Sequence, residues 1–211
     1  MWPDRRLLDL LGIDLPIIQA PMAGANGSAM VIAASTAGAL GSLPCAMLDG
    51  DKIRAEIGVI RQQTDRPFNV NFFCHAPSQS DPDVDAAWQA SLAGYYDEFG
   101  LDKDAQAPAT IRLPFNAATC ELIEELKPAV ASFHFGLPEA SLLVRVKDAG
   151  CVVLSSATTV EEARWLEARG CDAIIAQGYE AGGHRGIFLG DDISTQAGTL
   201  ALVPQVVDAV A

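Results

Sequence analysis

Three histidines are the side chains best suited to acid–base chemistry in this chain of 211 residues. Imidazole changes its charge near neutral pH, so a well-placed histidine can give or take a proton. His75, His134 and His184 each lie at or just beyond the carboxyl end of a predicted strand. Local hydrogen bonds could satisfy any one of them, but their shared position predicts a common cavity.

Amide side chains share one face of the strand predicted over residues 68–73. Because side chains alternate along a strand, Asn69, Asn71 and Phe73 point to one side, together with His75 just beyond. A buried amide costs on the order of 1 to 3 kcal/mol unless it is paired. A ligand ring with donors and acceptors is one explanation, and an asparagine ladder or a turn cap is the other.

A glycine-rich segment follows the strand predicted over residues 173–177. It reads Gly-Tyr-Glu-Ala-Gly-Gly-His-Arg-Gly and contains Gly182, Gly183 and His184. Paired glycines permit positive φ and let the backbone approach a flat or anionic ligand, which exposed N–H groups can then bind. Turns also contain glycine for purely conformational reasons. The histidine, the arginine and the preceding Gln177 nevertheless favour a ligand site here.

Familiar nucleotide, metal and hydrolase motifs are missing from the sequence. There is no G-x-G-x-x-G after the first predicted strand, no P-loop, no H-E-x-x-H and no G-x-S-x-G. The five cysteines are odd in number and lack a C-x-x-C, so they indicate neither a disulfide framework nor a zinc site. We therefore expect reduced, mostly buried thiols in a cytoplasmic protein without a metal site.

Short apolar runs alternate with helical patterns along the chain, which predicts βα units and a parallel sheet. Six runs have the length and the flanking residues of strands: 16–21, 39–43, 68–73, 129–135, 151–155 and 173–177. An open doubly wound sheet and a closed barrel both fit this pattern. Both folds place ligands at the carboxyl ends of the strands.

Caps and stops mark the helices predicted between these strands. Asp49 and Asn116 can each cap a helix whose apolar residues recur on one stripe. Thr159 and Glu162 have the spacing of a capping box. Pro204 suits the first turn of a last helix. The chain thus carries local start signals for most of its helices.

The regular spacing breaks between about residue 76 and residue 110. Polar residues there precede a segment with Trp88 and Phe99, which predicts a short helix within an insertion on a βα loop. Such insertions often cover an active site, although an ordinary surface excursion fits equally well. We otherwise expect a single domain over residues 1–211.

Composition excludes several classes of protein. With 27 acidic and 14 basic residues the formal net charge is -13, which would repel a nucleic-acid backbone. Half of the residues are hydrophobic, too many for a disordered chain, yet no run approaches the roughly 18 apolar residues of a membrane span. The first residues lack the apolar stretch of a signal peptide. We expect a globular protein that binds neither nucleic acid nor membrane.

Four motifs give the chain a resemblance to the nitronate monooxygenases, which are FMN enzymes on a TIM barrel. They lie on the first, third, fourth and sixth predicted strands: Gln19-Ala-Pro-Met-Ala-Gly24, Pro67-Phe-Asn-Val-Asn-Phe-Phe73, Ser132-Phe-His-Phe-Gly136 and Gln177-Gly-Tyr-Glu-Ala-Gly-Gly-His-Arg-Gly186. The resemblance runs from Leu7 to the last residue. It implies a TIM (β/α)8-type barrel, with about six of the eight βα units present in this chain.

The resemblance also implies a reaction and roles for single residues. The family oxidises nitronates, such as propionate 3-nitronate, with dioxygen to a carbonyl compound and nitrite. His184 would be the catalytic base or a hydrogen-bond donor beside the flavin N5, and His134 would bind the nitro group or a substrate carboxylate. The residues implied to contact FMN are Ala20, Pro21, Met22, Asn71, Gln177, Gly182 and Gly183.

Length distinguishes the chain from a whole barrel, which usually needs about 250 residues. We expect the last two strands, whose loops hold phosphate in such barrels, to be missing, so that the chain is truncated or part of a longer protein. Other subunits of a homo-oligomer could complete the site. Two alternatives stay open: an enzyme like the FMN-dependent enoyl-acyl-carrier-protein reductases, which use NAD(P)H, and a catalytically inactive barrel fragment.

Overall fold

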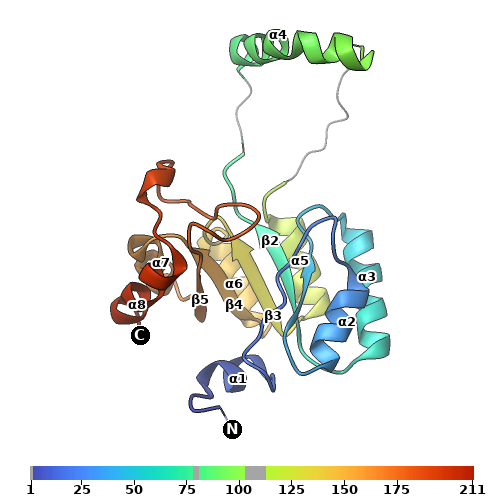
Figure 1. Ribbon diagram of the computed structural model, residues 1–211. Coiled ribbons are helices and arrows are strands. Elements are labelled where there is room, and N and C mark those ends of the chain that lie inside the picture. Colours follow the sequence, from blue (N-terminus) through green and yellow to red (C-terminus); the bar gives the residue numbers. More distant parts are fainter. Residues whose placement is uncertain (1, 78–80, 103–112) are drawn as a thin grey trace. The chain divides into compact units, whose positions relative to one another are not determined.

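A parallel sheet of five strands forms the centre of the fold. The computed structural model describes residues 2–77, 81–102 and 113–211. All neighbouring strands pair in parallel, which confirms the sheet type predicted from the sequence. The strands follow one another in chain order across the sheet (Figure 1): β1 Gly41–Pro44, β2 Phe68–Phe73, β3 Val130–His134, β4 Val152–Ala157 and β5 Ala173–Ala176.

The run predicted as the first strand, residues 16–21, forms a single β-bridge and no longer ladder. The bridge joins Ile18 to Leu40, just before β1, in the parallel sense. A proline nitrogen has no hydrogen to donate, so Pro16 and Pro21 limit the ladder at both ends. The prediction of a full strand was therefore wrong in length, although the segment lies beside β1 as the chain order requires.

A row of helices covers one face of the sheet. Along this row α2 contacts α3, α3 contacts α5, α5 contacts α6 and α7 contacts α8. The larger hydrophobic cluster lies between these helices and the strands and includes Leu43, Val70, Phe133, Ile57 and Leu166. The helices of the row are α2 Ser28–Thr36, α3 Gly50–Gln63, α5 Ala117–Leu126, α6 Ala140–Asp148, α7 Val160–Glu167 and α8 Thr199–Ala209.

A smaller hydrophobic cluster lies on the opposite face of the sheet, near the start of the strands. There Leu8 and Leu11 of helix α1 (Arg6–Leu11) pack with Val130 and Leu154. Toward the carboxyl ends of the strands the same face becomes polar, because the inward positions of β2 carry asparagines. The apolar residues fill this face near the start of the strands, and the polar residues near the carboxyl ends are available for a ligand site.

Two predicted helix caps are confirmed. The side chain of Asp49 accepts a hydrogen bond from the backbone N–H of Lys52 at the start of α3. Asn116 forms a capping box with Thr119 at the start of α5. Both caps satisfy N–H groups that have no partner within the first turn of a helix. The local sequence thus specifies where these two helices begin.

Two other helix signals have a different outcome. Thr159 caps α7, but the carboxylate of Glu162 binds other partners, so the expected capping box is not completed. Pro204 lies inside α8, which begins at Thr199, and not in its first turn. A proline inside a helix deprives the carbonyl four residues earlier of its donor. That residue, Leu200, is 94% exposed, so water can replace the lost bond.

The chain divides into two compact units, one of residues 1–75 and 113–211 and the other of residues 76–112. The second unit contains α4 (Pro82–Phe99), an 18-residue helix that is longer than the short helix predicted in the insertion. Asp81 caps its start and Gly100, at φ 63°, ends it. The predicted end of the insertion, at residue 110, lies outside the described residues.

Candidate functional site

Two histidines and a glutamine meet where β3 and β5 end. His134 is the last residue of β3, Gln177 follows β5, and His184 lies in the loop beyond. The backbone carbonyl of His184 accepts a hydrogen bond from Gln177 Nε2 at 2.9 Å and lies 3.2 Å from His134 Nε2. The fold therefore brings together three residues that the sequence had singled out separately.

The second ring nitrogen of His134 is also engaged. His134 Nδ1 lies 2.6 Å from the hydroxyl oxygen of Ser156, at the end of β4. Because the carbonyl of His184 can only accept, Nε2 carries the hydrogen, and Nδ1 of a neutral ring then accepts from Ser156. Burial lowers the pKa of His134 from its usual value near 6.5, which favours this neutral ring.

Phe73, at the end of β2, is the common neighbour of the three histidines. Its ring centroid lies 5.2 Å from that of His184, 5.7 Å from that of His134 and 6.3 Å from that of His75. The imidazole of His184 is exposed, whereas its backbone carbonyl is held. The three imidazoles thus lie around one aromatic ring, and His184 is exposed, so that a ligand could reach it.

Strained backbone accompanies this cluster. Phe135 directly follows His134 and has φ 66°, a region that a bulky residue rarely adopts. Its ring lies 4.5 Å from the His134 ring and 6.0 Å from the His184 ring, measured between centroids. Strain of this kind tends to be retained at functional sites, where neighbouring structure holds it in place.

Glycines of the loop after β5 fall into two groups. At Gly186 an added Cβ would lie 2.7 Å from His134 Cε1 and 2.8 Å from Ser156 Oγ, so no larger residue fits. Gly182 and Gly183 are exposed, and an added Cβ would meet nothing within 4 Å at either position. Gly186 permits close packing of the loop, whereas Gly182 and Gly183 leave open space beside exposed backbone.

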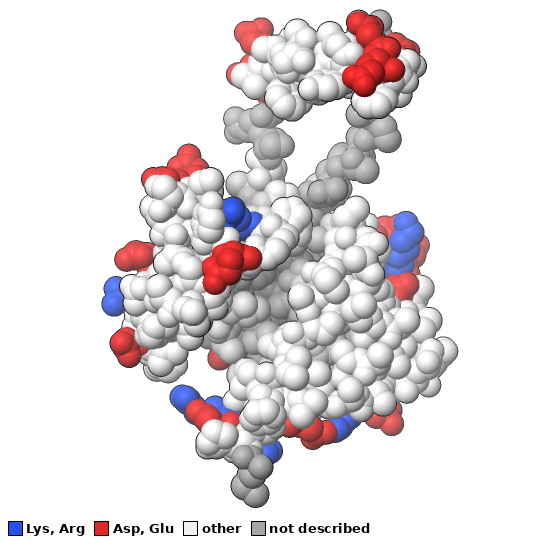
Figure 2. All heavy atoms as spheres, in the orientation of Figure 1, with Lys and Arg blue, Asp and Glu red and all other residues white. Residues whose placement is uncertain are grey.

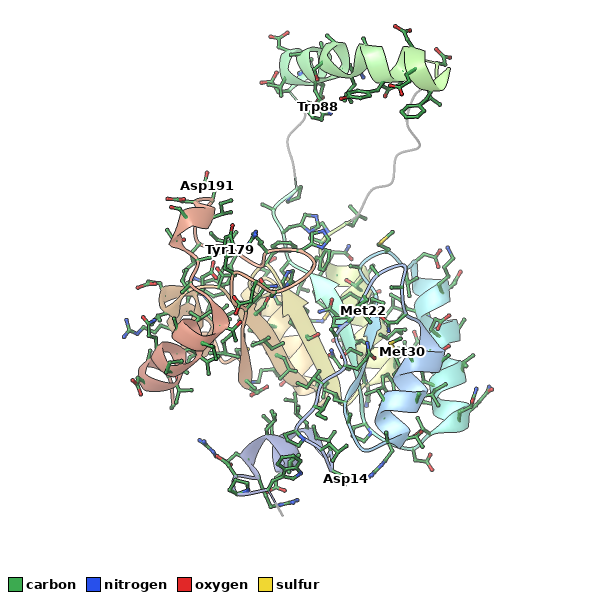
Figure 3. The ribbon with its side chains drawn as sticks, viewed as in Figure 1. Asp14, Met22, Met30, Trp88, Tyr179 and Asp191 are labelled. Atoms are coloured by element: carbon green, nitrogen blue, oxygen red, sulfur yellow. The ribbon has the colours of Figure 1, made fainter. Side chains whose placement is uncertain are left out.

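Polar side chains inside the loop hold its shape. Arg185 donates to the carbonyl of Tyr179 and to the side chain of Gln196, both at 3.0 Å, and its guanidinium lies 4.1 Å from the centroid of the Tyr179 ring. Glu180 accepts from the backbone N–H of Thr199, at the start of α8, at 2.9 Å. Figure 3 shows Tyr179 on this loop. The loop is therefore fastened both to itself and to α8.

Two asparagines and a serine form a polar stripe across the face of the sheet opposite the row of helices. Asn71 and Asn69 both donate to the hydroxyl of Ser132, at 2.9 and 2.8 Å, and Asn69 also donates to Ser42 at 3.0 Å. This network resembles the ladder considered above and accounts for the amide donors. In the described part of the chain, Asn69 Oδ1 is buried without a donor. A ligand N–H or a water on this face would satisfy it.

The predicted contact segment near the amino terminus lies beside β1. Ala20 is exposed, Pro21 is half-buried, and Met22 is 39% exposed (Figure 3). The backbone N–H of Met22 donates to Asn26 Oδ1 at 2.7 Å, and the Asn26 amide donates to the carbonyl of Ser42 at 3.0 Å. The structure thus fastens this segment to β1, whereas the histidines lie at the ends of β2 and β3 and in the loop after β5.

Sequence reasoning did not identify Ser156 and Asn26. The predicted strand ended at Ser155, two residues before the end of β4, although the alternation of Leu154 and Ser156 on one face was present in the sequence. Asn26 depends on a distant contact. Its partner, Ser42, lies 16 residues away, so no local pattern could indicate the contact.

The cysteines near this site are poor nucleophiles. Burial raises the pKa of the Cys74 thiol, next to His75, and raises that of Cys45 to about 12. The thiolate is the reactive form, and a raised pKa disfavours it. All five cysteines are free. Among the described residues no group of histidine, cysteine and carboxylate side chains could hold a metal ion.

Charge is unevenly distributed on the unit that contains the sheet. In the view of Figure 2, uncharged atoms cover most of this unit and charged groups lie mainly along its outline. The exposed acidic groups reflect the formal net charge of -13. No helix in the described residues is long and apolar enough to cross a membrane. Arg185 is engaged within its own loop, by Tyr179 and Gln196, and exposed backbone N–H groups can also bind an anionic ligand.

Comparison with known proteins gives consistent matches over nearly the whole chain. The chain is 47% identical over 200 residues to a nitronate monooxygenase of Paraburkholderia phytofirmans, a match that spans 94% of this chain and 54% of that protein. The structure of a nitroalkane oxidase from Streptomyces ansochromogenes matches with a TM-score of 0.81 and 36% identity over 97% of this chain and 58% of that one. FabK from Thermotoga maritima matches with a TM-score of 0.68 and 28% identity, over 98% of this chain and 51% of that one.

These matches confirm the α/β fold class expected from the sequence, a barrel-type fold with a parallel sheet. The chain spans a little over half the length of the curated relatives that it matches. The family model described as nitronate monooxygenase matches residues 4–211. The chain therefore belongs to the nitronate monooxygenase family.

Proposed function

We propose that this protein takes part in the FMN-dependent oxidation of nitronates, such as propionate 3-nitronate, by dioxygen to a carbonyl compound and nitrite. The observation that carries the proposal is the meeting of His134 and Gln177 at the carbonyl of His184, where the strands end, in a chain of this family. Active sites of barrel enzymes lie at this end of the strands.

The residues present fit a flavin in two respects. Gly182 and Gly183 leave bare backbone beside open space, which a flat ring or a phosphate chain can approach closely. The unpaired Oδ1 of Asn69 needs a donor, and the flavin ring carries an N–H. The residues that would hold FMN are Ala20, Pro21, Met22, Asn71, Gln177, Gly182 and Gly183.

FMN, when bound, supplies the redox chemistry by taking electrons from the substrate and passing them to dioxygen. The chain's own contribution is to bind, to orient and to handle protons. The exposed imidazole of His184 is suited to accept a proton or to donate a hydrogen bond beside the ring. His134 would contact substrate only if its Nε2 left the carbonyl of His184, so we assign it first to holding the loop.

We propose that the unit of residues 1–75 and 113–211 is an FMN-binding barrel domain, present in part, with residues 76–112 inserted. Its open carboxyl end would take the flavin. The chain covers 54% of its Paraburkholderia relative. We therefore assign the activity only to a protein in which the barrel is complete, either a longer chain or a homo-oligomer. Its partners would be a small nitronate and dioxygen.

Anaerobic mixing tests this function. Protein loaded with FMN is mixed with propionate 3-nitronate without oxygen, and the flavin absorbance is followed. We expect the nitronate alone to bleach the flavin, and air to restore the colour while nitrite forms. A flavin that stays oxidised with the nitronate, in protein shown to hold FMN, would overturn the proposal.

A second candidate is a reductase like the FMN-dependent enoyl-acyl-carrier-protein reductases. The match to FabK at 28% identity supports this candidate. The same experiment with NADH in place of the nitronate separates the two functions. Bleaching by NADH, without bleaching by the nitronate, would favour the reductase. A third candidate is a fragment without catalysis, which would bleach with neither reagent.

A further inference from the structure

Glu162 is a buried carboxylate to which the proposed function gives no role. It lies in the first turn of α7 and is 1% exposed. An ionised carboxylate is costly to bury unless several donors compensate for the lost water. The donors around Glu162 therefore indicate what the residue does.

The two oxygens of Glu162 bind two different segments. Oε2 accepts from the backbone N–H and from the hydroxyl of Thr158, directly after β4, each at 2.7 Å. Oε1 accepts from the backbone N–H of Phe188 at 2.6 Å and from that of Leu189 at 3.2 Å. Hydrogen bonds to an ionised acceptor are roughly twice as strong as neutral ones. The carboxylate thus joins the end of β4 to a distant loop.

Phe188 and Leu189 belong to the loop that carries His184. The Phe188 ring packs against the Trp165 ring at a centroid distance of 5.1 Å. On its other side it meets Gly136, where an added Cβ would lie 3.2 Å from Phe188 Cδ2. The side chain of Phe188 is therefore held between α7 and the end of β3, while Glu162 holds its backbone.

The other end of the same segment is fixed by the hydrogen bonds of Gln177 and His134 to the carbonyl of His184. We propose that Glu162 is a positioning residue that holds residues 184–189 and so orients the imidazole of His184. The proposal rests on the proposed function only for the importance of His184 in turnover. The arrangement of the loop can be tested without any turnover.

Glu162→Gln is the test variant, because it keeps the shape of the side chain but turns an N–H2 group toward backbone donors. Glu161→Gln is the matched control, since Glu161 is the exposed neighbour on the same helix turn. Hydrogen exchange is measured at the amides of Phe188 and Leu189. We expect exchange there to quicken at least tenfold in Glu162→Gln and to stay unchanged in Glu161→Gln.

The histidine spectrum reports the consequence for His184. The chain has only three histidines, so their ring carbon–proton resonances can be resolved and assigned by NMR. We expect the His184 resonance to shift or broaden in Glu162→Gln but not in Glu161→Gln. If the wild-type protein turns over a nitronate, kcat should fall at least tenfold with KM changed less than threefold, and Glu162→Asp should restore part of kcat.

Unchanged exchange at Phe188 and Leu189 in folded Glu162→Gln would overturn the proposal, and so would faster exchange with an unchanged His184 resonance. If Glu162→Gln does not fold, Glu162→Asp undergoes the same two measurements: its shorter side chain cannot reach all four donors, so exchange at Phe188 and Leu189 should be faster than in the wild type, and exchange and a His184 resonance like those of the wild type would overturn the proposal. A wild-type protein without nitronate turnover would contradict the proposed function alone, because the exchange and NMR results decide the role of Glu162 without it.

Discussion

His184 combines a fixed backbone with an exposed side chain. Its carbonyl accepts from Gln177 and lies within reach of His134, whereas its imidazole contacts Phe73 and is open to solvent. A group that exchanges protons with a ligand needs both properties, a defined position and access. His134 has the opposite character, because both of its ring nitrogens face protein partners.

Replacement of His184 by asparagine should lower nitronate turnover at least tenfold. Asparagine can still donate a hydrogen bond but cannot accept a proton as an imidazole can, so the loss measures the part played by proton transfer. Turnover is measured in protein whose flavin content per chain equals that of the wild type. Equal turnover in the two proteins would remove His184 from the mechanism.

His134 should make stability depend on pH. Its pKa in the folded protein is lowered by burial, so below about pH 6.5 the unfolded chain takes up a proton that the folded ring resists. The contribution of the neutral ring is therefore present above that pH and lost as the pH falls through the lower folded value. In His134→Gln the free energy of unfolding should fall less between about pH 7 and about pH 5 than in the wild type.

Denaturant titrations at the two pH values measure this difference. Carboxylates with lowered pKa, such as Asp49 and Glu124, lose their contribution only at more acidic pH, so they should not obscure the result. An equal loss of stability in wild type and His134→Gln would contradict the assignment of a buried neutral imidazole.

At the scale of elements, the loop after β5 connects the separate elements that make up the site. Its residues bond to the end of β3, to α7 and to the start of α8, and Gly186 packs closely against Ser156 of β4. Such a loop has little regular structure of its own, and its shape is set by side chains from other elements. Close packing against those elements is what its glycines permit.

Gly186→Ala should disturb this loop, and Gly190→Ala should not. A methyl group at Gly186 would lie 2.7 Å from His134 Cε1, so the loop or the histidine must shift, at a cost of about 1 to 3 kcal/mol. At Gly190 an added Cβ meets nothing within 4 Å. Chemical denaturation gives the two free energies of unfolding. Similar values for both variants would show that the packing at Gly186 is looser than the distances indicate.

At the scale of the whole molecule, the described sheet ends at β5, whose Ile175 is 42% exposed. Helix α8 beside it exposes Leu200 and Val207, at 94% and 67%. The chain spans a little over half of its curated relatives. In a longer protein or an oligomer, the apolar side chains exposed on β5 and α8 would be available for packing.

The 211-residue chain by itself should bind FMN weakly and release it during gel filtration. In barrels of this type the phosphate is held by the loops after the last two strands, and in the described residues no strand follows β5. The absorbances of flavin and of protein across the eluted peak give the number of flavins bound per chain. Elution with one flavin per chain would contradict this expectation.

The sequence by itself determined the βα rhythm, all five strands of the sheet to within two residues of their ends, and the caps at Asp49 and Asn116, because these depend on neighbours a few residues apart. It also identified the histidines and the glycine-rich loop, since strand ends can be read from apolar runs. It overestimated the strand at 16–21, where prolines remove the donors that a ladder needs.

Only the tertiary structure decided which groups meet. Ser156 binds His134 across 22 residues and Glu162 binds Phe188 across 26, distances over which no periodicity carries information. The spacing of Thr159 and Glu162 indicated a local cap, yet the buried carboxylate instead binds Thr158 and, in a distant loop, the backbone N–H groups of Phe188 and Leu189. Burial and long-range pairing, and not local pattern, assign these side chains their roles.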